Sequence, residues 1–87
     1  MLHRTLVLRI EGGLHARPCA LLARQADRAH GGVRIRRGIR VADARSVLEL
    51  MALMAGRGDE LVITVERDED EDVLDALAAI ATRSALD

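Results

Sequence analysis

Glycine residues constrain the fold of this chain more than any other feature, because all seven lie at four breaks in an otherwise regular apolar pattern. The breaks fall at residues 12–13, 31–32, 38 and 56–58. Glycine lacks a Cβ atom, so it adopts turn conformations that other residues avoid and it interrupts helices and strands. Each segment between the breaks therefore holds one or two short elements, whose type the apolar spacing predicts.

The N-terminal half predicts a strand, a helix and a hairpin. Leu6, Leu8 and Ile10 alternate with other side chains, which indicates a strand. Apolar residues then recur at helical spacing over residues 16–29, and the glycines at 31–32 are expected to end this helix in a left-handed cap. Residues 33–41 predict a β-hairpin that turns at Arg37-Gly38. Its apolar face would carry Val33, Ile35, Ile39 and Val41, and its basic face Arg34, Arg36 and Arg40.

The C-terminal half predicts a short helix, a strand and a final helix. Ser46 is placed as the N-cap of the apolar helix that follows it. A loop at 55–59 then leads into the β-branched strand at 60–66. Residues 68–87 predict a helix with acidic residues at its start and Arg83 near its end, as the helix dipole favours. The order β-α-β-β-α-β-α indicates an α+β fold, with a four-stranded antiparallel or mixed sheet covered by helices on one face.

Length and composition limit the class of protein. The 87 residues suit one domain, residues 1–87, and without any Phe, Tyr or Trp its core must be aliphatic. A net charge of −1 gives no general reason to expect a nucleic acid or an anionic membrane as partner. No apolar run approaches the roughly 20 residues that span a bilayer, and no secretory signal is recognisable. The single cysteine, Cys19, excludes an internal disulfide, so a cytoplasmic location is expected.

The stretch GGLHARPCA, residues 12–20, places His15 between a glycine pair and the start of the first predicted helix. A helix N-terminus presents N–H groups and the positive end of the helix dipole, so it attracts anions. The backbone amides of Ala16 and Arg17, together with the Arg17 guanidinium, would face such an anion. Histidine titrates near neutral pH, so a ring nitrogen of His15 can act as a nucleophile. The plainer alternative is a surface histidine near a helix start.

Residues Gly13 to Pro18, GLHARP, resemble the active-site motif of the HPr family. These are the histidine-containing phosphocarrier proteins of the bacterial phosphoenolpyruvate-dependent sugar phosphotransferase system. The resemblance extends over the whole chain and includes RSVLELM at 45–51 and the strand entry GRGDELVITVE. It implies an open-faced β-sandwich with four antiparallel strands and three helices on one face.

The resemblance also implies a role and partners. His15 would accept a phosphoryl group on Nδ1 from enzyme I and pass it to EIIA domains of sugar transporters, with Arg17 stabilising the phosphate. The chain would act as a monomeric carrier, and not as an enzyme that turns over substrate alone. The partner surface would join the first helix to the short second one, through Ala16, Cys19, Ala20, Arg24, Val47, Leu48 and Met51.

Ser46 lies where many family members carry a regulatory serine that a dedicated kinase phosphorylates. An N-cap alone is the plainer interpretation, and a phosphate there would add negative charge beside the docking surface. Three residues depart from the family pattern. Glu49 stands where glycine or lysine is usual, Asp27 where a basic residue is common, and Gly12 where a small polar residue is common. These departures bear on partner choice more than on phosphoryl acceptance.

Three alternatives remain open for the function. The element order is also that of ferredoxin-like RNA-binding domains, but those stack bases on aromatic side chains, which this chain lacks. A regulatory paralogue in a nitrogen-related branch of the phosphotransferase system would keep His15 and pair with different EIIA proteins. A stand-alone enzyme would need more than the one evident nucleophile.

Other patterns predict structure more than chemistry. His3, His15 and His30 lack metal-ligand spacing, so neither a metal nor a cofactor is expected. Arg57-Gly58-Asp59 indicates a turn before a strand. Cys19 is expected to be a small core residue, although partial exposure near a helix N-terminus would lower its thiol pKa.

Overall fold

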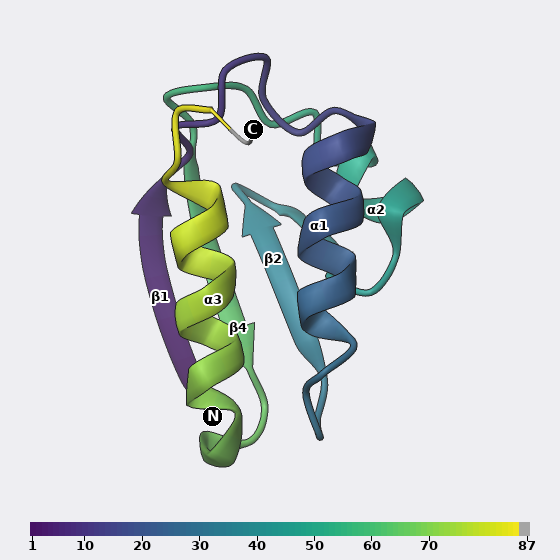
Figure 1. Cartoon of the computed structure of the whole chain (residues 1–87), viewed down its shortest axis with the longest axis vertical. Coiled ribbons are helices and arrows are strands. Elements are labelled where there is room, and N and C mark those ends of the chain that lie inside the picture. The colour runs from purple at the N-terminus through teal and green to yellow at the C-terminus, as the bar shows by residue number, and fades with distance from the viewer. Residues whose placement is uncertain (86–87) are drawn as a thin grey trace.

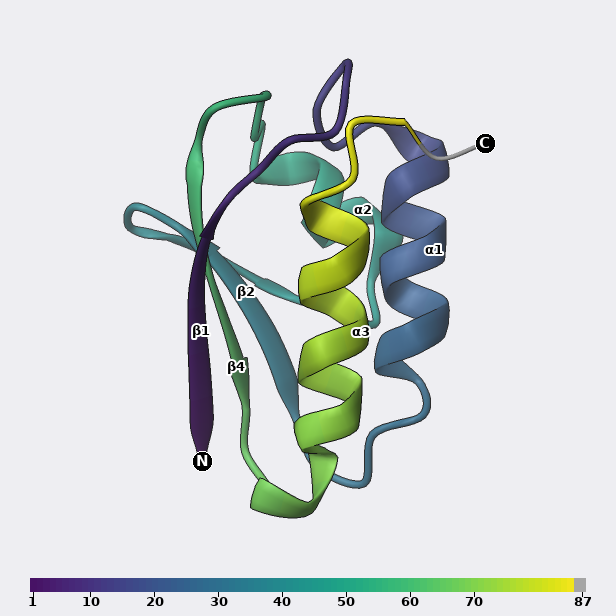
Figure 2. The ribbon, with the colours of Figure 1, turned by 60° about the vertical axis from the view of Figure 1, so that its left-hand side comes forward.

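A computed structural model, which describes residues 1–85, shows one antiparallel sheet with the helices on one side of it (Figures 1 and 2). Its strands run in the spatial order β1-β4-β2-β3, and every neighbouring pair is antiparallel. The predicted α+β fold is thereby confirmed, and the sheet is antiparallel throughout. The elements are β1 Leu2–Val7, α1 Ala16–Ala26, β2 Val33–Arg37, β3 Arg40–Asp43, α2 Val47–Ala52, β4 Glu60–Val65, the 3₁₀ turn η1 Asp68–Asp70 and α3 Glu71–Ala81.

Strand β1 lies earlier in the sequence than predicted. Its last pair joins Val7 to Glu60, where β4 begins, so the sheet offers no further partner strand beyond that point. Leu8 and Ile10, which the alternation assigns to the strand, are buried in the core after it. The Leu8 backbone instead bonds the turn before β4, with its N–H donating to the Asp59 carbonyl at 2.8 Å. The alternation therefore indicates the strand correctly, but the predicted position of the strand is wrong.

Helix α1 ends sooner than expected and without a left-handed glycine. Its last residue is Ala26, and its C-cap Asp27 has a φ of −61°. Among the glycines, positive φ values occur at Gly12, Gly13, Gly38 and Gly58, and not at the two that follow this helix. The predicted glycine cap is therefore wrong, and contacts from elsewhere in the chain hold the next loop.

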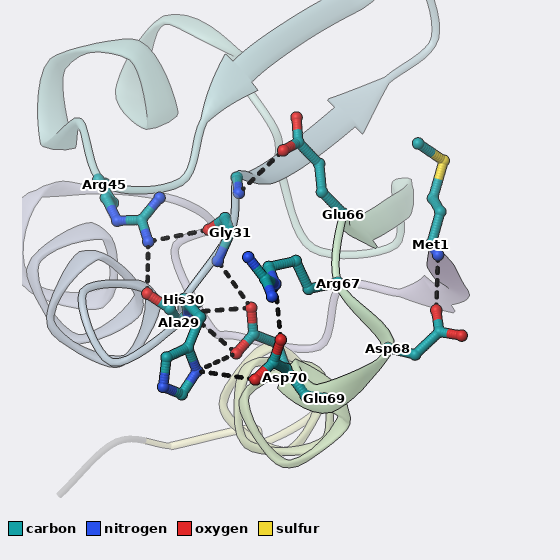
Figure 3. Close-up of polar contacts among 11 residues, drawn as sticks. Met1, Ala29, His30, Gly31, Arg45, Glu66, Arg67, Asp68, Glu69 and Asp70 are labelled. Carbon is teal, nitrogen blue, oxygen red and sulfur yellow. Dashed lines mark hydrogen bonds and ion pairs between the residues drawn. The ribbon is translucent and has the colours of Figure 1, made fainter.

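The loop between α1 and β2 is held by the carboxylate of Asp70, which stands at the start of α3 (Figure 3). Its oxygens accept hydrogen bonds from the backbone N–H groups of His30 at 3.0 Å and Gly31 at 2.9 Å. The Nδ1 atom of His30 lies 3.0 Å from the same carboxylate. Asp70 is only 1% exposed and is the one buried charged residue in the described part of the chain.

The hairpin of β2 and β3 has different faces from those predicted. Arg37 pairs with Arg40, so Gly38 and Ile39 form the turn, and the side chains of β3 alternate in the opposite sense. Ala42 therefore faces the core, whereas Ile39 is 98% exposed. Val41 lies beside Arg36 on the open face. The Arg40 guanidinium donates to the Ala52 carbonyl at the end of α2, so it does not belong to that open face.

The last helix is shorter than the predicted segment. Residues 68–70 form a 3₁₀ turn, and α3 proper covers Glu71–Ala81 with acidic residues in its first turn. Arg83 lies beyond the Thr82 C-cap, so its predicted place inside the helix end is wrong. The final two residues of the predicted helix, 86–87, lie outside the described residues.

Met54 adopts a backbone conformation that favours glycine. Its φ is +55°, and it follows the C-cap of α2, where left-handed residues commonly end helices. We expect Met54→Gly to raise the free energy of unfolding by about 1 kcal/mol, because the Cβ atom is the source of the strain. Ala52→Gly, inside the same helix, is expected to lower it by about 1 kcal/mol. Urea unfolding measures both, and a Met54→Gly chain less stable than the parent would contradict this explanation.

Candidate functional site

His15 is the N-cap of α1 and is exposed to solvent. Its φ of −84° and ψ of −177° are extended, and its carbonyl accepts the first helical hydrogen bond, from the Cys19 N–H at 3.2 Å. The preceding residue, Leu14, is buried, and its N–H donates to the Ala55 carbonyl at 3.0 Å. A buried residue on one side and a helix on the other thus fix the backbone of His15, while its side chain stays accessible.

The glycine pair before His15 has a steric purpose. Gly12 and Gly13 have φ values of +84° and +72°. A Cβ atom on Gly13 would lie 2.5 Å from the Ala55 carbonyl oxygen, which is too close for any side chain. A Cβ atom on Gly12 would lie 3.4 Å from Cδ2 and 3.6 Å from Nε2 of His15. The Cδ2–Nε2 edge of the imidazole therefore lies toward Gly12, and Nδ1 belongs to the opposite edge of the ring.

The three histidines have different surroundings. The Nδ1 atom of His3 lies 2.9 Å from the Thr64 hydroxyl, and that of His30 lies 3.0 Å from the Asp70 carboxylate. Within residues 1–85, the His15 ring makes no hydrogen bond to another side chain and does not cap its own helix. An incoming group can therefore reach the ring nitrogens of His15 without breaking a hydrogen bond, whereas the rings of His3 and His30 are already bonded.

The first turn of α1 places the other predicted phosphate-binding groups next to His15. Ala16 and Arg17 are exposed and are the first two residues of the helix. Pro18 is buried in the same turn, where a residue without an N–H group costs the helix little. The motif thus brings an exposed histidine, an exposed arginine and a helix N-terminus to one end of the molecule.

Most residues of the predicted partner surface are exposed to solvent. Helices α1 and α2 pack against each other, which places their exposed residues on adjoining surfaces. Leu48 and Met51 are 80% and 38% exposed. Met54, just after the C-cap of α2, is a further exposed apolar residue at 71%. Of the other predicted contacts, Ala16, Ala20 and Arg24 are exposed and Val47 is half-buried.

Cys19 differs from the other predicted contact residues, because it is completely buried. Its Sγ lies 3.5 Å from the Leu14 carbonyl. Burial raises the pKa of the thiol to about 11, since the thiolate would lose its hydration. Cys19 therefore cannot offer its side chain to a partner, and the expectation that it is a core residue is confirmed.

Ser46 caps α2, as predicted. Its Oγ accepts a hydrogen bond from the Glu49 N–H at 3.1 Å. The Glu49 carboxylate is also engaged, because it accepts from the Asp43 N–H at 3.1 Å. Asp27, the other acidic departure from the family pattern, lies 3.9 Å from the Arg45 guanidinium. Glu49 and Asp27 thus both contact other residues of this chain.

The remaining sequence patterns form structural contacts. Residues 57–59 form the turn before β4, as predicted, and the Asp59 carboxylate accepts from the Gly56 N–H at 2.7 Å and the Arg37 Nε at 3.0 Å. These hydrogen bonds hold the pKa of Asp59 below its usual value. Among residues 1–85, three or more His, Cys, Asp or Glu side chains do not gather as a metal site would require. Nor does any described helix have the length and apolarity to cross a membrane.

The fold and the histidine motif together define a small α+β protein that presents one histidine at an exposed helix N-terminus. The family model described as "PTS HPr component phosphorylation site" matches residues 2–83. This chain therefore belongs to the HPr family, the phosphocarriers of the phosphotransferase system.

Three relatives illustrate the range of the family. The phosphocarrier protein HPr of Treponema pallidum is 32% identical over 77 residues, which cover 88% of each chain. The crystal structure of an HPr from Bacillus anthracis has 32% identity and a TM-score of 0.85, with 92% of this chain and 95% of that chain covered. The HPr-like protein Crh of Bacillus subtilis is 29% identical over 79 residues, 91% of this chain and 93% of Crh. A crystal structure of Crh, described as a dimer with a swapping domain, has a TM-score of 0.74 at 28% identity, with both chains fully covered.

Proposed function

We propose that this chain is a phosphocarrier that accepts a phosphoryl group on Nδ1 of His15 from phospho-enzyme I and passes it to EIIA domains of sugar transporters. One structural observation supports this proposal most directly. The His15 ring is exposed at a helix N-terminus, with its Nε2 edge toward Gly12 and its Nδ1 edge away from that glycine. The whole chain, residues 1–87, would act as one carrier domain in the cytoplasm.

The transfer is a pair of nucleophilic substitutions at phosphorus. The neutral Nδ1 lone pair of His15 attacks the phosphorus of the donor's phosphohistidine, and the bond from phosphorus to the donor nitrogen breaks. The electron pair of that bond remains on the donor imidazole. In the second transfer, the acceptor nucleophile of the EIIA domain attacks the same phosphorus, and Nδ1 of His15 is the leaving group. The chain is regenerated, so it carries the group and consumes no substrate of its own.

Arg17 and the first amides of α1 stabilise the transferred phosphate. The N–H groups of Ala16 and Arg17 lie at the positive end of the helix dipole, and a guanidinium matches phosphate oxygens. We expect Arg17→Gln to slow phosphoryl acceptance about tenfold, as the loss of one charge-assisted contact implies. Rapid-quench kinetics with phospho-enzyme I measure this rate. Arg28→Gln, just beyond the far end of α1, is the matched control, and equal rates in the two variants would remove Arg17 from the site.

Partner docking is proposed for the surface that α1 and α2 share. Its apolar centre consists of Leu48 and Met51, and a flexible methionine adapts to partners of different shape. Solvent-exposed apolar side chains beside a reactive group are typical of a surface that a partner covers. The proposed docking residues are Ala16, Ala20, Arg24, Val47, Leu48 and Met51.

Ser46 is a candidate for regulation by a serine kinase and phosphorylase. A phosphate on Ser46 would stand beside Val47 and Leu48, and its charge would oppose docking of an acidic partner surface. The Glu49 carboxylate one helical turn away would repel the same phosphate. Incubation with such a kinase and ATP, followed by mass analysis of wild type and Ser46→Ala, tests this part of the proposal.

The choice of acceptor distinguishes the sugar carrier from a regulatory role in a nitrogen-related branch. The phosphorylated chain is mixed with a panel of EIIA domains from both branches, and the loss of its phosphoryl group is followed over time. Rapid transfer to sugar-transporter EIIA domains is the expected result. Transfer to nitrogen-branch domains alone would support the regulatory alternative.

We propose that the carrier is a monomer in solution. The crystal structure of Crh is described as a dimer. Light scattering at the concentration used for phosphotransfer would test whether this chain is a monomer.

A further inference from the structure

One side of the sheet carries no helix (Figure 2). Side chains on that side line a hollow of about 510 Å³. The registers of the strands arrange its side chains in two rows that cross the sheet. The first row is Thr5, Val62, Arg36 and Val41, and the second is His3, Thr64, Arg34 and Asp43. The hollow is lined by these residues, except Asp43, and by Met1.

Two arginines dominate the charge of this hollow. Arg34 and Arg36 are two residues apart on β2, so their side chains leave the same face of the sheet about 7 Å apart. The cross-strand neighbours of Arg36 are Val62 and Val41, so no carboxylate lies opposite it in either described register. The two like charges thus stand side by side in a chain whose net charge is close to neutral.

The acidic groups near the hollow stand at its rim. Glu66 approaches the Arg34 guanidinium at 3.5 Å, in a contact exposed at both ends. The Asp43 carboxylate accepts from the Arg45 N–H at 2.9 Å, and Asp43 does not line the hollow. Within residues 1–85, the lining itself contains no Asp or Glu. An anion in the hollow therefore meets no carboxylate across from Arg36, and at Arg34 it displaces only the exposed contact with Glu66.

The rest of the lining supplies hydrogen-bond donors and an apolar floor. The Thr5 hydroxyl lies in the row of Arg36, and the Thr64 hydroxyl contacts His3 at 2.9 Å. Val62, between Thr5 and Arg36, gives the floor an apolar centre, and Val41 extends it. A few polar groups around an apolar floor, in a hollow of this volume, are the features of a small-molecule site.

We propose that this hollow binds a phosphate monoester with a small apolar body. Arg34 and Arg36 receive the phosphate oxygens, because guanidinium groups match phosphate in charge and geometry. The body of the ester lies over Val62 and Val41. This site is separate from His15, which lies in the loop beyond the end of β1, and its occupation does not depend on the proposed phosphocarrier role.

The test is a titration of the full chain with phenyl phosphate, followed by ¹H–¹⁵N NMR spectra. The expected result is a set of saturable shifts at the amides of Thr5, Arg34, Arg36 and Val62. Arg36→Gln is expected to weaken this binding at least fivefold. Arg28→Gln, an arginine on the helix side of the protein, is expected to leave it unchanged.

Three outcomes would overturn the proposal. One is that phenyl phosphate shifts only the amides of residues 15–17, at the helix N-terminus. Another is that Arg36→Gln binds as tightly as wild type while its spectrum shows an intact fold. The third is that inorganic phosphate shifts the sheet amides with equal affinity, because the apolar floor would then have no part in binding.

Discussion

His15→Ala is expected to abolish phosphoryl acceptance, whereas wild type should gain one acid-labile phosphoryl group from phosphoenolpyruvate and enzyme I. The reason is chemical: alanine has no nucleophile, and no neighbouring group in the first turn of α1 replaces the ring. The His15 side chain is exposed and does not cap the helix, so its removal should leave the fold intact. Intact-mass analysis measures the gain directly.

The other two histidines provide matched controls. His3→Ala removes a ring bound to Thr64, and His30→Ala removes one bound to Asp70. Both variants are expected to accept a phosphoryl group as wild type does. A phosphoryl group that persisted in His15→Ala, or that disappeared in His3→Ala with an intact fold, would contradict the assignment.

Asp70→Asn is expected to destabilise the protein more than the loss of any exposed carboxylate at the start of α3. The carboxylate is buried and accepts hydrogen bonds from the N–H groups of His30 and Gly31 (Figure 3). An amide turns one acceptor oxygen into a donor, which would face those N–H groups. A drop of about 10 °C in the midpoint of thermal unfolding at pH 7 is expected. Circular dichroism measures it.

The destabilisation caused by Asp70→Asn should become smaller as the pH falls below about 4. The N–H groups of His30 and Gly31, and to a lesser degree the His30 ring, lower the pKa of Asp70 from 3.8 to about 2, although burial acts in the opposite direction. A carboxyl whose pKa is lower in the folded state contributes stability above its unfolded pKa. That contribution is lost as the pH falls from about 4 through the folded value of about 2.

The control for this prediction is Asp68→Asn. Asp68 lies two residues earlier, is 75% exposed at its side chain and pairs with the N-terminal amine (Figure 3). Its replacement should change the unfolding midpoint by about 2 °C at most, as expected for an exposed ion pair. If Asp68→Asn and Asp70→Asn were equally destabilising, general charge at the start of α3 would explain the effect, and the bonds to the loop would not.

The type and order of the helices and strands were predictable, because local apolar spacing determines them. The β-branched strand β4 and the Ser46 cap of α2 lie where their local patterns predict them. The extent of β1 was not predictable, because it depends on where β4 begins across the sheet. The end of α1 was equally inaccessible, since a carboxylate 40 positions away organises the loop at His30. Such long-range pairs leave no periodic signal in the sequence.

For the site, the motif around His15 was recognisable as six consecutive residues, since its geometry is local. The helical spacing of Cys19 predicts a core position, whereas the family resemblance places it on the partner surface. Its burial in the structure agrees with the core position. The exposure of Ile39 and the crosswise rows on the open face follow from the turn at Gly38-Ile39 and from strand register. Neither is evident from one segment alone.

The most direct test of the phosphocarrier role is a long-range ¹H–¹⁵N spectrum of the chain with ¹⁵N-labelled histidine rings, recorded before and after incubation with phosphoenolpyruvate and enzyme I. We expect that one ring changes, that it belongs to His15, and that the altered nitrogen is Nδ1. A phosphoryl group on Nε2 of His15, or on the ring of His3 or His30, would contradict this assignment.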